Sequence, residues 1–178
     1  MTGKPQSTGA AKPAISAQTP DWSRERKPRF AWMPGRALLA SLRAYQAHAA
    51  SRNPLRRLVL KRVAVLRHRF WSVVCGADIP LNCCIGGGLL IPHPNGIVIH
   101  PQASIGPNCL ILQQVTIGLR DGDVPPVIGG HVDIGAGAKI LGGVCIGDHA
   151  RIGANAVVLR DVPAGKTAAG VPARILGD

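Results

Sequence analysis

The sequence has few aromatic residues and no long apolar segment. Aromatic side chains make up 3% of the 178 residues, whereas hydrophobic residues as a whole make up 46%, and there are 22 glycines and 15 prolines. This composition disfavours a sandwich with large aromatic anchors and favours a core of small aliphatic side chains at a repeated spacing. No run reaches the roughly 18 to 20 apolar residues that a membrane-spanning helix needs.

Metal-ligand and leader motifs are also missing. The five cysteines are an odd number, Cys83 and Cys84 are adjacent, and no CxxC pair or ligand-spaced Cys/His cluster occurs. This pattern predicts reduced thiols and no bound metal. The first residues have no apolar stretch behind their charges, so we expect no secretory leader and a cytoplasmic location.

Acidic residues are scarce in the first part of the chain. Residues 1–72 hold 15 Lys and Arg against 2 Asp and Glu, whereas residues 73–178 hold 6 against 7, so the net charge of +12 divides into +13 and −1. A nucleic-acid-binding protein is expected to carry its charge on a folded platform with aromatic stacking residues. Here the basic part is partly a Pro/Ser/Ala tail, and we expect no nucleic-acid partner.

Composition and periodicity divide the chain into three segments. Residues 1–34 show neither a helical nor a strand period, which predicts a flexible basic arm. Residues 35–75 carry apolar residues at helical spacing before and after Pro54, which predicts two short amphipathic helices. The second helix has a basic face, made up of Arg56, Arg57, Lys61, Arg62, Arg67 and Arg69. This face fits a solvated surface, and it also fits peripheral contact with an anionic inner-membrane surface.

Residues 76–178 repeat with a period of six. An aliphatic or small residue recurs at Ile79, Ile85, Ile91, Ile97, Ile105, Ile111, Ile117, Ile128, Ile134, Ile140, Ile146, Ile152, Val158 and Ala164. Two extra residues before Ile105 and five before Ile128 interrupt the series. Such units bury their apolar side only when they stack as parallel strands. The predicted fold is therefore mainly β, a parallel β-helix of triangular section preceded by a short helical segment.

Several strings in this region resemble serine acetyltransferases, a group of hexapeptide-repeat acyltransferases. They are CGADIP, IPHPNGIVIHPQASIG, LILQQVTIG, IGAGAKILGG, ARIGANAVVLRDVP and AAGVPARILG. The resemblance implies a left-handed β-helix, a homotrimer with its active site between subunits, acetyl-CoA as donor and a hydroxyl compound as acceptor. It also implies His93 as the general base and Asp78, fifteen residues upstream, as its acidic partner.

Acyl transfer from a thioester to a hydroxyl needs a base for the hydroxyl proton, and neutral imidazole suits that role. A carboxylate on the other ring nitrogen fixes the tautomer and stabilises the imidazolium. The alternative is that Asp78 caps the first coil and His93 is a turn residue. Weaker candidates are His100, at the two-residue insertion, His131 and His149, all expected on the surface. A zinc site on His93, His100 and His131 is a further alternative, but their spacing disfavours it.

The resemblance also implies where acetyl-CoA binds. Gly118, Ala136 and Ala154 match small family positions, against which the pantetheine can approach the backbone. Lys139 and Arg174 are cations suited to its phosphates, although an exposed turn explains Lys139 equally well.

The loop LRDGDVPPV departs from the serine acetyltransferase pattern. In that family a longer loop carries an Arg-His pair for the serine carboxylate, whereas Val124, Pro125 and Pro126 stand here, and Pro92 replaces the Asp before the catalytic His. We therefore expect an O-acetyltransferase whose acceptor is L-serine or a sugar of exopolysaccharide biosynthesis. The alternative is a non-catalytic β-helical scaffold that docks through its basic arm.

Overall fold

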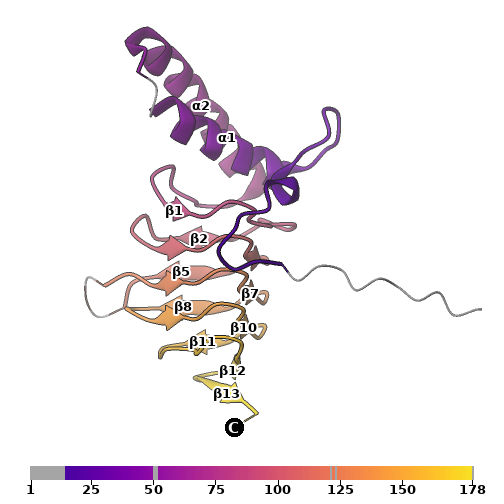
Figure 1. Cartoon of the computed structure of the whole chain (residues 1–178), viewed down its shortest axis with the longest axis vertical. Coiled ribbons are helices and arrows are strands. Elements are labelled where there is room, and N and C mark those ends of the chain that lie inside the picture. Colours follow the sequence, from indigo (N-terminus) through magenta and orange to yellow (C-terminus); the bar gives the residue numbers. More distant parts are fainter. Residues whose placement is uncertain (1–14, 50–51, 121, 123, 178) are drawn as a thin grey trace, which may run out of the picture.

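Two helices precede a stack of short strands in the computed structural model, which describes residues 15–49, 52–120, 122 and 124–177 (Figure 1). Helices α1 (Pro34–Ala49) and α2 (Pro54–Cys75) form a hairpin that projects past one end of the stack. Each begins at a proline, whose fixed φ and missing N–H suit the first helical turn. A 3-10 helix, η1 (Trp22–Glu25), lies upstream. Among the described residues, no helix has the length and apolarity needed to cross a bilayer.

The strands form three sheets that the chain visits in turn. They are β1 (Cys84–Ile85), β2 (Val98–Ile99), β3 (Ser104–Ile105), β4 (Leu110–Ile111), β5 (Thr116–Gly118), β6 (Val127–Ile128), β7 (Asp133–Ile134), β8 (Lys139–Leu141), β9 (Cys145–Ile146), β10 (Arg151–Ile152), β11 (Val157–Val158), β12 (Thr167–Gly170) and β13 (Ala173–Leu176). The sheet orders are β1-β3-β6-β9, β13-β12-β10-β7-β4 and β11-β8-β5-β2. The last of these is called sheet A below. The predicted parallel β-helix and the helical segment before it are confirmed.

Each of the strands β1 to β12 turns one buried residue inward, and the inward residues form columns. In sheet A the column contains Ile99, Ile117 and Ile140, each at most 1% exposed. Burying an isoleucine contributes about 1.5 to 3 kcal/mol, so columns of this kind hold the coils together without aromatic side chains. Cys83 and Cys109 are buried in the same core.

The two-residue insertion does not lie between Ile97 and Ile105, where the spacing predicts it. Strand β2 pairs with β5 so that Ile99 stands beside Ile117, and Asp78 bridges to β2 from the preceding coil. Ile99 therefore fills the column position that was assigned to Ile97. Ile97 is also buried, but it occupies the turn before the strand. The extra residues thus lie in the turn 92–97, which we call the bulged turn, and not after Ile97.

The last coil also differs from the predicted register. Ile146 bridges to Val162, so Val162 stacks in that column in place of Ala164. The final strand, β13, then turns back and pairs antiparallel with β12. This hairpin ends the parallel stack in the described part of the chain.

Part of the predicted flexible arm, residues 1–34, is instead packed on the β-helix; residues 1–14 lie outside the described residues. We call residues 15–33 the strap. The buried side chain of Asn108 accepts a hydrogen bond from the Asp21 amide at 2.8 Å. Its own amide donates to the carbonyls of Ser16 at 2.7 Å and Thr19 at 2.8 Å. One polar side chain of the β-helix thus binds three backbone groups of the strap.

A carboxylate fixes the middle of the strap. Glu25 accepts hydrogen bonds from the amides of Gly88 at 2.9 Å and Leu89 at 3.2 Å, and it pairs with Arg43 of α1 at 2.9 Å. The glycine turn also makes room for the strap, because a Cβ on Gly87 would lie 2.6 Å from the Trp22 ring. The strap, α1 and the first coil are therefore joined at one point.

Replacing Asn108 by alanine is expected to release the strap. Three hydrogen bonds of about 1 kcal/mol each are lost, so trypsin cleavage at Arg24 and Arg26 should become at least tenfold faster in limited proteolysis (~1.4 kcal/mol per tenfold). Exposed Asn82 provides the matched control, and Asn82→Ala should leave the cleavage rate unchanged. Equal cleavage of both variants would show that Asn108 does not hold the strap.

Candidate active site

The bulged turn brings His93 to the corner of the β-helix that precedes sheet A. It packs on the preceding coil, where the amide of Gly96 donates to the carbonyl of Gly76 at 2.7 Å. Immediately after that contact, the amide of Asp78 donates to the carbonyl of Ile97 at 2.8 Å. The structure therefore puts His93 at this corner and Asp78 on the preceding coil, where it bridges to Val98 of β2, and both side chains are exposed.

The two side chains are not hydrogen-bonded to each other. Among the described residues, neither the Asp78 carboxylate nor the His93 imidazole has a hydrogen-bond partner. The negative charge of Asp78 acts on two buried neighbours. Burial lowers the pKa of His68, and Asp78 partly opposes that effect. Burial raises the pKa of the Cys83 thiol to about 11, and Asp78 adds to that rise.

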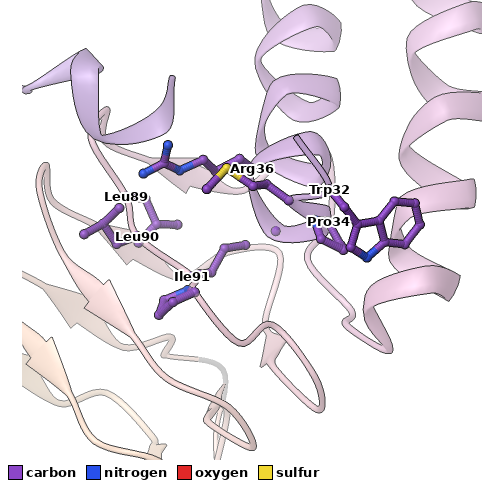
Figure 2. Close-up of a pocket in the computed structure, with 9 residues that line it drawn as sticks. Trp32, Pro34, Arg36, Leu89, Leu90 and Ile91 are labelled. Atoms are coloured by element: carbon purple, nitrogen blue, oxygen red, sulfur yellow. The ribbon is translucent and has the colours of Figure 1, made fainter. Parts of the chain in front are cut away.

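Two cavities open beside these residues. Asp78 lines one of about 540 Å³ together with Arg69 and Ser72 of α2. The other cavity, of about 290 Å³, is lined by Pro92, the residue that precedes His93. Figure 2 shows its walls, with Leu89, Leu90 and Ile91 from the β-helix facing Trp32, Pro34 and Arg36. Sequence reasoning missed this cavity because Trp32 was assigned to a flexible arm.

Three of the expected donor-site residues share the corner of His93. Ala136 and Ala154 occupy equivalent turns on successive coils, where the Asn155 amide donates to the Ala136 carbonyl at 2.8 Å. Lys139 follows at the start of β8, and its ammonium group donates to the carbonyl of Gln114 at 2.5 Å. The corner before sheet A thus presents His93 on one coil and small residues with a cation on later coils.

Gly118 and Arg174 lie elsewhere. Gly118 ends β5 and stands at the corner after sheet A, where its carbonyl accepts from the Gly142 amide at 3.0 Å. Arg174 is exposed on β13 and lines a cavity of about 310 Å³ with Arg160 and Asp161. Within one protomer the expected donor residues are therefore divided between two corners and the terminal hairpin.

The short loop after β5 packs down on the next coil. A Cβ on Gly143 would lie 2.7 Å from Val124, so the loop and the coil are in close contact. Arg120 and Arg160 line a cavity of about 280 Å³ at this corner with Asp161. Sequence reasoning did not single out either arginine. Each follows a sheet A strand by two residues, a signal that is visible once the columns are aligned.

The remaining histidines form no candidate centre. His100 directly follows β2 rather than lying in the insertion, and its Nδ1 accepts from the Gln102 amide at 3.3 Å. The Nδ1 atoms of His131 and His149, on successive coils, lie 2.9 Å apart, and burial lowers the pKa of His131. Within the described ranges, no group of three or more His, Cys, Asp or Glu side chains is arranged to hold a metal ion.

The chain shares sequence and fold with known acetyltransferases. The family model for bacterial transferase hexapeptide (six repeats) matches residues 125–160. Over 137 residues the chain is 46% identical to serine acetyltransferase 1, chloroplastic, of Arabidopsis thaliana, which covers 75% of this chain and 43% of that protein. The chain thus spans less than half the length of this curated relative.

Solved structures give the same result. Soybean serine acetyltransferase, as apoenzyme, superposes with a TM-score of 0.60 at 35% identity, covering 79% of this chain and 69% of that chain. A serine acetyltransferase solved in complex with CoA superposes with a TM-score of 0.67 at 39% identity, covering 82% of this chain and 58% of that chain.

The thiols are expected to differ sharply in reactivity. Cys84 and Cys145 are exposed, whereas burial raises the pKa values of Cys83 and Cys109 to about 11. Because the thiolate is the reactive form, a chromogenic disulfide reagent near pH 8 should react rapidly with two thiols only. A Cys84→Ser/Cys145→Ser variant should lose the rapid phase. Rapid labelling of Cys109 in the native protein would contradict this assignment.

Proposed function

The chain belongs to the serine acetyltransferase family of hexapeptide-repeat proteins, and on that premise we propose that it transfers the acetyl group of acetyl-CoA to a hydroxyl oxygen of a small acceptor. In this proposal His93 is the general base and Asp78 is its acidic partner. The observation that supports it most is the bulged turn. The two additional residues of that coil leave His93 exposed at a corner, in the turn before β2, to which Asp78 bridges from the preceding coil.

The proposed chemistry is a direct transfer within a ternary complex. His93 takes the hydroxyl proton while the oxygen attacks the thioester carbonyl, and backbone amides stabilise the resulting oxyanion. Collapse of this intermediate breaks the C–S bond, and the imidazolium returns the proton to the CoA thiolate. Asp78 stabilises the imidazolium through the other ring nitrogen. No enzyme thiol is needed, and Cys83, with a pKa of about 11, is protonated at neutral pH.

Acetyl-CoA is proposed to lie along the corner before sheet A. Ala136 and Ala154 are small enough for the pantetheine to reach the backbone, and the ammonium group of Lys139 suits a phosphate. Gly118 and Arg174 belong to other edges of the protomer, so they join the same donor site only if a second copy supplies them. We therefore propose a homotrimer with the donor cleft between neighbouring subunits. The related enzyme solved with CoA supports acetyl-CoA as the donor.

We propose L-serine as the acceptor, because the relatives described above are named serine acetyltransferases. Val124 and Pro125 stand where the family pattern has the Arg and His that bind the serine carboxylate. Charge-assisted hydrogen bonds contribute about 1.5 to 3 kcal/mol each. The chain is therefore expected to bind serine weakly.

His93→Ala is expected to lower kcat by about 10² to 10⁴ while CoA affinity stays the same, because a proton acceptor of the transition state is removed. Release of free CoA measures turnover, and calorimetric titration measures CoA binding. His100→Ala is the matched control, since His100 lies seven residues further on and outside the proposed machinery. Unchanged turnover in His93→Ala would remove His93 from the mechanism.

The acceptor can be identified by CoA release with L-serine, other small hydroxyl compounds and nucleotide sugars. We expect turnover with L-serine, and we expect Val124→Arg to lower the KM for serine by about tenfold through one charge-assisted hydrogen bond. Val171→Arg, at an exposed valine of the terminal hairpin, should not change that KM. Turnover of a nucleotide sugar by a protein that is inactive on serine would overturn serine as the acceptor.

A further inference from the structure

Helix α2 has a second apolar face that the described residues of the protomer leave exposed. Its packed face includes Ala64, His68 and Cys75, all buried. At 100° per residue, five apolar side chains lie on the opposite side of the helix within a sector of about 80°. They are Val59, Val63, Leu66, Phe70 and Val73, with exposed fractions of 50%, 46%, 64%, 58% and 83%. We call these five residues the free face of α2.

Arginines border the free face on both sides. Arg62 and Arg69 lie along one edge and Arg67 along the other, and all three are exposed. Neither α1 nor α2 contains an acidic residue. The free face is therefore an apolar stripe bordered by cations, and the acidic residue beside its end is Asp78, which lines one cavity with Arg69 and Val73. Its partner has to be both apolar and anionic.

Aromatic side chains extend the free face toward the strap. The ring of Trp71 lies 5.1 Å from that of Phe70 and 5.8 Å from that of Trp32, between ring centroids. Trp32 is 75% exposed. Indole rings are favoured at the boundary between lipid headgroups and hydrocarbon. In Figure 1 the helical hairpin projects beyond the β-helix.

We propose that the free face of α2 binds the surface of an anionic lipid bilayer, with the helix lying in the plane of the interface. Interfacial helices combine an apolar face with flanking Lys and Arg in this way. Val63, Leu66 and Phe70 enter the acyl boundary, while Arg62 and Arg69 reach the lipid phosphates. This proposal does not rest on the proposed enzymatic function.

A second copy of the chain fits the free face less well. The 4-3 spacing of its residues also occurs in coiled coils, where residues bordering the apolar seam pair across the interface. In a parallel pair of α2 helices, Arg62 of one copy would face Arg67 of the other, and neither helix offers an acidic partner. Such a pairing buries the stripe but brings like charges together, whereas an anionic bilayer neutralises them.

The test is cosedimentation of the full chain with vesicles of phosphatidylcholine, either pure or with about one-third phosphatidylglycerol. We expect at least tenfold stronger partitioning to the anionic vesicles, reduced on going from about 0.1 M to about 1 M salt. Tryptophan emission should shift to shorter wavelength on binding. Leu66→Ser/Phe70→Ser should weaken partitioning by tenfold or more, and Arg62→Gln/Arg69→Gln by about 25-fold.

Matched controls and a second measurement make the outcome decisive. Val127→Ser and Arg151→Gln change exposed residues of the β-helix and should bind as the unaltered protein does. Thermal melting reports whether each variant folds. Equal binding to both vesicle types, or no binding, would overturn the proposal. It would also be overturned if Leu66→Ser/Phe70→Ser lowered the molar mass in sedimentation equilibrium without vesicles, because the free face would then be an interface between copies.

Discussion

The in-register stacking of inward side chains from one coil to the next is the constraint on which the rest of the structure depends. Ile99, Ile117 and Ile140 keep sheet A in register because a shift by one residue would turn every inward side chain outward. Residues in excess of the period therefore have to leave the stack at a corner. The bulged turn is where this happens in the first full coil, and it carries His93.

The strap and the helical hairpin build on this stack without sharing its period. Asn108 binds backbone groups of the strap, and Glu25 binds backbone amides of the first coil. Arg43 connects Glu25 to α1. These contacts fix Trp32 next to the cavity beside the bulged turn. Residues far apart in the sequence are thereby gathered around the corner of His93, while α2 turns its free face outward.

The sequence was sufficient to predict the β-helix, because the six-residue period and small core residues such as Cys109 leave few other ways to bury the apolar side. It was not sufficient to locate the two-residue insertion, since Ile97 and Ile99 are both buried isoleucines and only pairing with β5 distinguishes them. The strap was missed because one buried side chain, Asn108, holds it across some ninety residues, which no local pattern reveals. His93 and Asp78 came from a family resemblance, and their placement on neighbouring coils depends on the observed register.

The most direct test of this account is a double-mutant cycle on kcat/KM for acetyl transfer with Asp78→Asn, His93→Ala and the double variant. If Asp78 acts through His93, Asp78→Asn should lower kcat/KM strongly in the unaltered protein and hardly at all once His93 is replaced. Independent, multiplying losses in the two single variants would contradict the account, because the two side chains would then not act as a pair.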